Sequence, residues 1–272
     1  MWGQVVIGPP GSGKSTYCKG MKEFLGGVGR EVVIVNMDPS NDFLIYEAGI
    51  DVRELICLKN VMEQYKLGPN GGLLFCMEYL EKNVDWLINK VKSFDKSSYY
   101  FIFDCAGQVE LYTSHNCVKN ILKSVEKVLN CKLCVVNLMD SVYCLDTPKY
   151  VSSLIVSLSM MVYLEFPHVN VLSKCDIIRK EKMPFRLSYY TDVKNLKFIV
   201  DNPEGSNNRK RLKFSQALAE VVEDYDYVSY VPLYIESKED VLKVITIVDK
   251  ANGYIFGLLE KNKLQSIVTK EK

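Results

Sequence analysis

Residues 8 to 15 have the composition of a loop that binds phosphate groups. The run consists of Gly8, Pro9, Pro10, Gly11, Ser12, Gly13, Lys14 and Ser15. An apolar run precedes it and a helical pattern begins near Thr16, which is the context that this spacing requires. Glycines let consecutive backbone N–H groups turn toward a phosphate, and the helix start adds the positive end of its dipole. The sequence therefore predicts a nucleoside triphosphate site.

Three oxygen-bearing side chains are expected to bind a divalent cation beside that loop. In loops of this type the lysine, here Lys14, bridges the β- and γ-phosphates, and the hydroxyl of Ser15 binds Mg²⁺. Asp104 ends an apolar run, where its carboxylate can orient a water molecule bound to the cation. Asp38 follows another apolar run and can hold Mg²⁺ or its water. The predicted metal residues are Ser15, Asp38 and Asp104.

The residues after Asp104 are candidates for the chemical step. Gly107 can offer its N–H to the γ-phosphate, while Gln108 and Glu110 can position an attacking water or sense the γ-phosphate. Asp38 is a further candidate. Asp42, in the same Asp-Pro-Ser-Asn-Asp segment, is either a base or an ordinary surface residue. The identity of the catalytic base stays open among these side chains.

A second recognition element lies in the run Val171 to Asp176, which resembles the Asn/Thr-Lys-x-Asp segment that reads guanine. Asp176 can accept hydrogen bonds from the ring N–H and the exocyclic amine of guanine. Adenine does not present this donor pair, so the carboxylate would reject it. Lys174 can lay its aliphatic stem over the purine. Ser173 stands where Asn is usual, and we expect its shorter side chain to tie the base loop to the phosphate loop less firmly.

Six apolar runs of strand length alternate with helical patterns along the chain. They span Gln4–Ile7, Glu31–Asn36, Tyr99–Asp104, Lys132–Leu138, Val169–Leu172 and Tyr227–Leu233. This alternation predicts an α/β fold of the three-layer P-loop NTPase type, with a mostly parallel central sheet and helical insertions. Ligands of such sheets bind at the carboxyl ends of the strands, where the candidate residues lie.

Two stretches interrupt the alternation. Residues 40–95 contain helical segments around Leu67 to Gly72, whose glycines and proline favour tight turns over regular structure. Residues 178–226 are polar and are expected to form a helical insertion or lid, with a turn at 203–208. We expect residues 1–272 to form a single domain that carries both insertions.

Bulk composition excludes several partners and compartments. Charged residues make up 25% of the chain and nearly cancel, leaving a net charge of +1, so we expect no direct binding to nucleic acid or to a membrane. The longest apolar stretch, 151–166, contains serines and Glu165 and is expected to be a helix packed on the sheet.

The start of the chain has no pattern of a secretion signal. The odd number of cysteines, nine, indicates a reducing cytoplasm, and Cys131 and Cys134 are interpreted as parts of a buried strand instead of a zinc site.

The motif Gly68-Pro69-Asn70 makes the chain resemble the GPN-loop GTPases, and the sequence of its motifs is most similar to that of the second eukaryotic paralogue. The resemblance covers almost the whole length. Beyond the phosphate loop its segments are Gly68–Gly72, Cys76–Leu80, Asp85–Leu87, Asp104–Glu110, Leu164–Lys174 and Asp249–Tyr254. Two departures are Ala106, where the family usually has Pro, and Ser40, where it usually has Ala. Both lie in expected switch segments.

The resemblance implies a GTP-binding and slowly GTP-hydrolysing dimeric switch with GTP or GDP and Mg²⁺. It implies that Asn70 reaches the phosphate site of a partner subunit, and that Pro232 and Leu233 lie in the last base-contacting loop. The partner would be a second copy or a paralogous GPN-loop GTPase. The clients would be subunits or assembly factors of RNA polymerase II and of RNA polymerase III, assisted in assembly or nuclear import. The implied location is the cytoplasm with shuttling to the nucleus.

Two other functions stay open at this level. A P-loop kinase would use lid arginines over the phosphates, and the second insertion contains Arg179, Arg186, Arg209 and Arg211. A nucleotide-bound assembly factor with negligible turnover would use Gln108, Glu110 and Asn70 only to sense phosphate.

Overall fold

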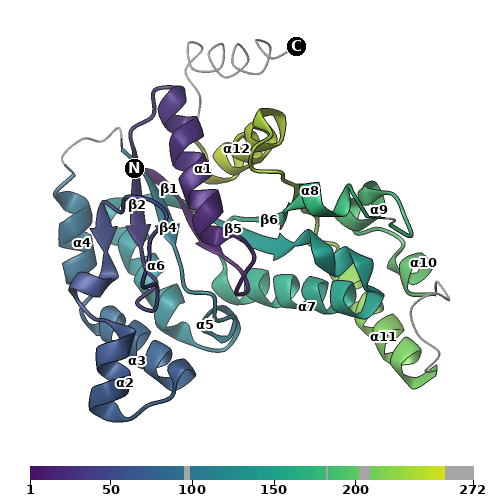
Figure 1. Ribbon diagram of the computed structural model, residues 1–272, viewed down its shortest axis with the longest axis horizontal. Helices are drawn as coiled ribbons and strands as arrows, with labels where there is room; N and C mark the ends of the chain where they lie inside the picture. Colours follow the sequence, from purple (N-terminus) through teal and green to yellow (C-terminus); the bar gives the residue numbers. More distant parts are fainter. Residues whose placement is uncertain (95–98, 182, 202–208, 255–272) are drawn as a thin grey trace.

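A single parallel sheet forms the centre of the molecule (Figure 1). The computed structural model describes residues 1–94, 99–181, 183–201 and 209–254. The sheet has seven strands in the order β3-β2-β4-β1-β5-β6-β7. The strands are β1 (Trp2–Ile7), β2 (Val32–Asn36), β3 (Ile50–Asp51), β4 (Tyr100–Asp104), β5 (Lys132–Asp140), β6 (His168–Ser173) and β7 (Tyr230–Pro232). All six predicted strands are confirmed, and the predicted three-layer α/β fold with them.

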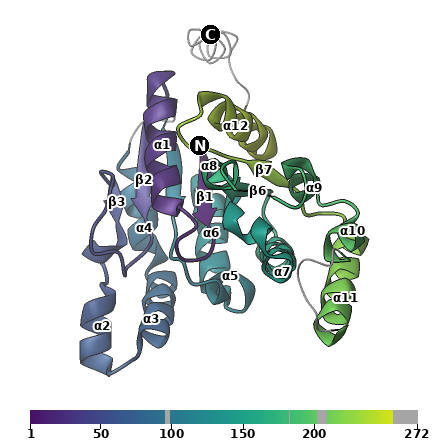
Figure 2. The ribbon, with the colours of Figure 1, turned by 45° about the vertical axis from the view of Figure 1, so that its right-hand side comes forward.

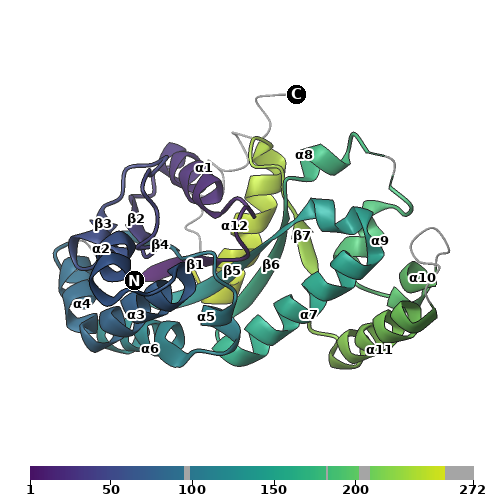
Figure 3. The same cartoon turned by 60° about the horizontal axis from the view of Figure 1, so that its bottom comes forward.

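Helices cover both faces of the sheet (Figure 3). On one face lie α1 (Lys14–Gly27) and α12 (Lys238–Asn252). The opposite face is covered by α3 (Pro69–Lys82), α4 (Val84–Lys92), α5 (Glu110–Thr113), α6 (Asn116–Leu129) and α7 (Thr147–Leu164). The helix expected over residues 151–166 is α7, and its Met160 and Leu164 pack against the sheet as predicted. No helix among the described residues is long and apolar enough to cross a membrane.

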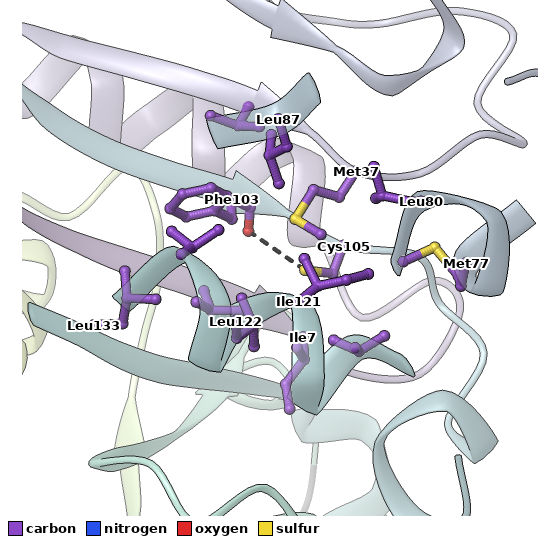
Figure 4. Packing of buried hydrophobic residues seen from close by; sticks show 14 of the residues in the cluster. Ile7, Met37, Met77, Leu80, Leu87, Phe103, Cys105, Ile121, Leu122 and Leu133 are labelled. Atoms are coloured by element: carbon purple, nitrogen blue, oxygen red, sulfur yellow. Dashed lines mark hydrogen bonds between the residues drawn. The ribbon is translucent and has the colours of Figure 1, made fainter. Parts of the chain in front are cut away.

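Alternate residues of each central strand enter different cores, because side chains point to opposite faces of a sheet. Val5 and Ile7 of β1 pack beneath α6, whereas Val6 packs beneath α1 and α12. Figure 4 shows the first of these cores, in which Phe103 of β4 lies among side chains of several helices. Both faces of β4 are therefore buried, and all five of its residues are inaccessible to solvent.

The first insertion differs from its sequence prediction in two ways. The short strand β3 was not predicted; it adds only two residues to the sheet edge before the 3₁₀ turn η1 (Val52–Glu54). The glycine-rich segment at 67–72 is not a free turn, because α3 begins inside it at Pro69. Proline at the first helical position loses no hydrogen bond, since that N–H has no partner within a helix. Gly72 lets α2 (Leu58–Tyr65) approach: a Cβ there would lie 2.8 Å from Leu58.

The second insertion is helical where it is described. It contains α9 (Leu187–Asp192), α10 (Leu196–Val200) and α11 (Arg209–Tyr225), and the short helix α8 (Cys175–Ile178) leads into it. Figures 1 and 2 show α11 at the opposite end of the molecule from α2 and α3. The expected turn at 203–208 lies outside the described residues. Short η2 (Ser141–Leu145) joins β5 to α7.

The cysteines behave as small apolar side chains. Cys134 lies in β5 and Cys131 just before it, and both are buried and free, as expected for a buried strand. Burial raises the pKa of each thiol to about 12, so neither is a reactive thiolate near neutral pH.

Candidate nucleotide-binding site

The predicted phosphate loop connects the buried strand β1 to the N-terminus of α1. Its backbone is left-handed at Gly8 (φ 141°), Gly11 (φ 76°) and Gly13 (φ 90°), a region that side chains disfavour. A Cβ on Gly8 would lie 2.3 Å from the Leu138 carbonyl oxygen, so only glycine fits against β5. Glycine is thus required both for the turn and for packing. The loop can wrap an anion with its backbone N–H groups.

Lys14 is held inside this loop. Its Nζ donates to the carbonyl oxygens of Gly8 at 3.1 Å and Pro9 at 3.0 Å. Burial lowers the pKa of the ammonium, while the nearby Asp104 carboxylate opposes that shift. A Cβ on Gly107 would lie 3.1 Å from Lys14 Nζ. The loop after β4 therefore packs directly on the ammonium that is expected to meet phosphate.

Asp104 lies at the end of β4 with its two carboxylate oxygens in different situations. Oδ2 accepts hydrogen bonds from Ser15 Oγ at 2.9 Å and from Tyr46 OH at 2.6 Å. Oδ1 is buried and has no hydrogen-bond partner among the described residues. Burial raises the pKa of this carboxyl group, and the two hydroxyl donors counteract the rise. An inaccessible carboxylate oxygen without a donor is a place for a further ligand.

The oxygens of Ser15 and Asp104 fit a magnesium ion. Hydroxyl and carboxylate oxygens are the donors that this hard cation prefers, and it commonly keeps several of its waters. The buried Oδ1 can accept a hydrogen bond from such a water. Asp38 lines the same cleft, but its Oδ1 already accepts from the backbone N of Ser40 at 2.9 Å and from Ser40 Oγ at 2.5 Å. The serine that replaces the usual alanine thus holds one carboxylate oxygen of Asp38.

The polar residues around Asp38 fix the connection between β2 and β3. Asn36 accepts from the Asp38 backbone N at 3.1 Å and donates to Asp51 at 2.9 Å. Arg53 donates to Asp51 and also to the Asn41 carbonyl oxygen at 2.6 Å. Its guanidinium lowers the pKa of Asp51 despite partial burial. The predicted first switch segment is therefore tied to the sheet edge by charge-assisted hydrogen bonds.

A cleft of about 940 Å³ joins the segments that were expected to meet phosphate. The predicted residues that line it are Pro10, Gly11, Gly13, Lys14, Ser15, Thr16, Asp38, Asn70, Gly107, Gln108, Glu110 and Lys174. Gln108 Oε1 is buried without a partner among the described residues, and Glu110 is exposed at the start of α5. Asp42 does not line the cleft and is exposed, as its surface-loop interpretation predicts.

A smaller pocket of about 150 Å³ lies where the base was expected. It is lined by the predicted residues Gly13, Thr16, Ser173, Lys174, Asp176 and Leu233, together with Tyr17, Leu138 and Ile235. The carboxylate of Asp176 makes no hydrogen bond within the described part of the chain, so both of its oxygens are available to a ligand. Pro232 ends β7 and does not line this pocket, in contrast to Leu233 beside it.

Ser173 reaches the phosphate loop in spite of its short side chain, and whether it holds the loop less firmly than Asn would stays a prediction. Its hydroxyl lies 2.8 Å from the Ser12 carbonyl oxygen and 3.0 Å from that of Met139, so it contacts the phosphate loop directly despite its short side chain. The reason is that β6 and β5 run side by side, with Ser173 opposite Asp140, which brings the backbone close enough. Ser12 Oγ itself is buried and has no partner in the described part of the chain.

Lys174 joins the two pockets. It lines both of them, as Gly13 and Thr16 do. Its backbone is left-handed at φ 58°, its carbonyl oxygen accepts from Ser141 Oγ at 2.9 Å, and its Nζ pairs with Asp140 at 2.7 Å. This pairing holds the aliphatic stem beside Gly13, where it can cover one face of a bound base.

The comparisons with known proteins agree with this geometry. A zebrafish (Danio rerio) protein named GPN-loop GTPase 2 is 52% identical over 270 residues, which cover 98% of this chain and 86% of the relative. The chain belongs to the GPN-loop GTPases. Another member, GPN-loop GTPase QQT1 of Arabidopsis thaliana, is 49% identical over 97% of this chain and 89% of its own length. GPN-loop GTPase 2 of Saccharomyces cerevisiae is 43% identical over 94% and 76%.

Two further comparisons support the fold. A family model described as "conserved hypothetical ATP binding protein" matches residues 6–254. The crystal structure of a GTPase in apo form from Pyrococcus abyssi has a TM-score of 0.74 at 20% identity, covering 93% of this chain and 98% of that one. The family model thus names adenosine triphosphate, whereas the curated GPN-loop relatives are named GTPases.

The Gly-Pro-Asn segment that gives the GPN-loop GTPases their name lies at the rim of the phosphate cleft. Gly68 is the N-cap of α3, and Pro69 and Asn70 both line the cleft. Because Asn70 lies in the first turn of a helix, its position is fixed by the packing of α3 against α2 and α6. A rigid element presents the amide.

Sequence reasoning missed several residues of this GPN-loop GTPase site. Tyr46 contacts Asp104 but lies in no phosphate-binding motif, and Asp140, which pairs with Lys174, ends a strand without a recognised pattern. Asp140 could have been found, since parallel strands place their carboxyl ends together. No signal in the chain marks Tyr46, because its contact spans 58 residues.

Proposed function

We propose that this GPN-loop GTPase binds GTP and hydrolyses it to GDP and phosphate with Mg²⁺. The observation that carries the proposal is the meeting of two pockets at Gly13, Thr16 and Lys174, one lined by the phosphate loop and the other by Asp176. The names of the curated relatives support the same activity. The sequence predicts this combination from two segments 161 residues apart that are joined by the Ser173–Ser12 hydrogen bond.

The base pocket favours guanine over adenine, in contrast to the family model's description. Asp176 offers two acceptor oxygens that no described residue occupies, and guanine has an N–H and an amine to fill them. Adenine would place no such donor pair there, leaving a carboxylate without its hydrogen bonds in a confined pocket. The stem of Lys174 covers the ring and does not discriminate between the purines.

The chain's own residues hold the triphosphate. The backbone N–H groups of the phosphate loop surround it, and Lys14, now bound by carbonyl oxygens, would turn its ammonium to the phosphate oxygens. Ser15 would bind Mg²⁺, with Asp104 and Asp38 holding its waters. When bound, Mg²⁺ neutralises charge on the β- and γ-phosphates.

In hydrolysis a water oxygen bonds to the γ-phosphorus while the bond from that phosphorus to the bridging oxygen of GDP breaks. Gln108 and Glu110 lie at the cleft and would hold this water, whose proton passes to a phosphate or carboxylate oxygen. The buried Oε1 of Gln108 is an acceptor without a partner in the described structure, as a water-binding role requires. Gly107 would donate its N–H to the γ-phosphate.

Dimerisation and the client are further parts of the proposal. Asn70 lies at the rim of the cleft, in the first turn of α3. In a dimer, the Asn70 amide of one subunit would reach the γ-phosphate bound by the other. Such an amide stabilises developing charge without an arginine. The family resemblance supports a homodimer or a heterodimer with a paralogue, acting in RNA polymerase assembly or import. The same resemblance is the basis for a cytoplasmic location with shuttling to the nucleus.

The kinase alternative has less support in the geometry. Arg179 donates to Asp240 at 3.3 Å, and Arg186 lines a separate pocket on the second insertion. Neither arginine lines the phosphate cleft. The side chains of Arg209 and Arg211 lie outside the described structure. Gln108 and Asn70 could sense the phosphate as well as assist its hydrolysis. Only a measurement of turnover therefore tests the hypothesis of an assembly factor with negligible hydrolysis.

Base specificity provides the first test. Fluorescent GDP bound with Mg²⁺ is displaced by GTP or by ATP, and we expect GTP to be favoured by about 100-fold or more. Asp176→Asn should reduce this preference by at least tenfold, since it replaces one acceptor with a donor. Asp224→Asn, an exposed change of the same kind on α11, is the matched control. Equal displacement by ATP and GTP in the unmodified protein would contradict the proposal.

Turnover provides the second test. Single-turnover hydrolysis of GTP is measured for the unmodified chain, Gln108→Ala and Asn70→Ala across protein concentrations. A role for Asn70 in trans predicts a rate that rises with concentration and is lost in the Asn70 variant. Release of labelled γ-phosphate only as free phosphate distinguishes hydrolysis from transfer to an acceptor. Unchanged rates in both variants would remove Gln108 and Asn70 from the chemical step.

A further inference from the structure

Tyr46 reaches the phosphate site from a segment without any recognised motif. It lies in the connection between β2 and β3, and only 9% of its surface is exposed. Its ring packs in the core formed with α1 and α12, together with Val6 and Ile34. From this anchored position its hydroxyl donates to Asp104 Oδ2 at 2.6 Å. Neither the phosphate loop nor the base-reading segment accounts for this contact.

The hydrogen bonds at Asp104 divide its two oxygens. Ser15 and Tyr46 both donate to Oδ2, and Oδ1 is buried without a partner among the described residues. Two donors from different segments of the chain fix the carboxylate's rotation, since turning it would break both bonds. In this fixed orientation of the carboxylate, Oδ1 stays available to a ligand. A buried carboxylate oxygen held in this way is expected to meet a donor supplied by a ligand.

The arrangement is compatible with a bound cation. A serine hydroxyl can coordinate Mg²⁺ through a lone pair of its oxygen while its O–H continues to donate to Asp104. The Tyr46 hydroxyl can likewise continue to donate to Oδ2, because a metal-bound water would donate to the other oxygen, Oδ1. Neither existing hydrogen bond needs to break when the cation enters.

We propose that Tyr46 is a positioning residue for Mg²⁺: its hydroxyl fixes Asp104 so that Oδ1 accepts a hydrogen bond from a water of the ion. This inference rests on the proposed nucleotide function and extends it to a residue outside the predicted motifs. Tyr46 acts through Asp104 and does not touch the nucleotide.

The chain on both sides of Tyr46 is anchored, so the hydroxyl is held in place before any ligand binds. Arg53 donates to the carbonyl oxygens of Asn41 at 2.6 Å and Asp42 at 3.2 Å. Gly49 donates its backbone N–H to Ile34 at 2.8 Å, and the Glu47 carbonyl oxygen accepts from Lys22 at 3.1 Å. A donor held by its own surroundings positions its acceptor at little entropic cost.

Tyr46→Phe removes the hydroxyl and keeps the ring, which would continue to fill the core. Dissociation of fluorescent GDP is followed from zero Mg²⁺, with chelator, to saturating Mg²⁺. We expect the Mg²⁺ concentration for half-maximal slowing to rise about tenfold, the usual effect of losing a hydrogen bond to a charged group. The affinity measured in chelator should stay within about twofold, because the phosphate loop and Asp176 are intact.

Tyr150→Phe is the matched control. Tyr150 is fully buried in α7, and its hydroxyl donates to the Tyr190 carbonyl oxygen at 2.8 Å, away from both pockets. This variant loses a comparable hydroxyl and should keep the wild-type Mg²⁺ response. If it shifted the Mg²⁺ response as much as Tyr46→Phe does, general loosening of the core would explain the effect and the inference would be overturned.

A double-mutant cycle with Asp104→Asn distinguishes positioning from packing. If Tyr46 acts through Asp104, the two changes together should raise the Mg²⁺ requirement hardly more than Asp104→Asn alone. Fully additive effects, or an unaltered Mg²⁺ response in Tyr46→Phe, would overturn the inference while leaving GTP binding by the unmodified protein in place. Absence of guanine-nucleotide binding by the unmodified protein would instead overturn the proposed function, and the inference with it.

Discussion

Two buried charged clusters lie at the two ends of the parallel strands and differ in how completely their polar atoms are paired. The side of the sheet where the strands begin is called the amino edge, and the side where they end is called the carboxyl edge. At the amino edge, Arg30 donates to both carboxylate oxygens of Asp249, at 3.1 and 2.7 Å. Both side chains are almost inaccessible, with 2% and 1% of their surface exposed. The guanidinium also lies 4.2 Å from the ring centre of Tyr254. This cluster needs nothing from outside the chain.

The carboxyl edge is built in the other way. Asp104, Ser12 and Gln108 each have a buried side-chain oxygen without a partner in the described structure. Lys14 rests on backbone carbonyl oxygens instead of a carboxylate. Unsatisfied buried groups cost stability, and they persist where a ligand completes them. The motif Asp249 to Tyr254 therefore maintains the fold, whereas the motifs at the other edge maintain a site.

The largest expected effect comes from breaking the closed cluster. Asp249→Ala removes the carboxylate from a buried guanidinium, which should lower the free energy of unfolding by about 3–5 kcal/mol. Denaturant unfolding of the nucleotide-free chain measures this loss. At a temperature where the variant is folded, its affinity for GDP should match that of the unmodified protein.

The control for that change is Glu165→Ala. Glu165 also forms two ion pairs, with Lys119 and Lys123 at 2.9 Å, but it is exposed to solvent. Solvent and salt screen such pairs, so little stability should be lost. Equal destabilisation by the two variants would show that the Arg30 pair has no special weight in the fold.

The next largest effect is expected at the carboxyl edge, where a substitution should reduce nucleotide affinity and leave stability almost unchanged. Lys14→Met keeps most of the stem and removes the ammonium that is expected to contact phosphate. We expect GTP affinity to fall by about 100-fold or more, since each charge-assisted hydrogen bond contributes about 1.5–3 kcal/mol. Stability of the nucleotide-free protein should change by less than about 1 kcal/mol, because burial already disfavours the charged form of Lys14.

Isothermal calorimetry with GTP and Mg²⁺, alongside unfolding of the same samples, checks both parts of this prediction. A variant that lost stability as Asp249→Ala does, or that kept its GTP affinity, would contradict the division between a structural edge and a functional edge.

The parts of the site that the sequence predicts are those in which function follows from a few neighbouring residues. The phosphate loop is one of them, because its glycine conformations and its lysine lie within one turn of chain. The six longer strands are likewise predicted, since continuous apolar runs are typical of strands buried on both faces. The expected positions of Asp104 and Asp176 follow from where those strands end.

The remainder depends on contacts between distant segments. Ser173 reaches Ser12 because two strands pair in a particular register, which the residue type alone does not indicate. Tyr46 approaches Asp104 only when its ring packs in the same core as Ile34 of β2. The start of α3 within Gly68–Gly72 was missed because proline and glycine, usual in turns, also suit the first turn of a helix that packs closely on another.

The smallest expected effect concerns His168, whose ring nitrogens are buried at the amino edge. It begins β6, and neither of its ring nitrogens has a partner among the described residues. Burial lowers its pKa to about 3, below the ordinary value of 6.5. The unfolded chain therefore takes up a proton below about pH 6.5 while the folded chain does not, so stability falls as the pH decreases. The loss should approach about 1.4 kcal/mol per pH unit between pH 6 and pH 4.

Urea unfolding of the unmodified chain, His168→Gln and His115→Gln at pH 7.5, 6.5 and 5.5 isolates this contribution, because the chain has only two histidines. The difference in stability between the unmodified chain and His168→Gln should narrow, or change sign, as the pH falls. His115→Gln should follow the unmodified chain if His168 is the titrating group. A pH response that is the same in all three proteins would mean that the imidazole of His168 gains a proton in the folded state. The amino edge would then be as open as the carboxyl edge at this one position.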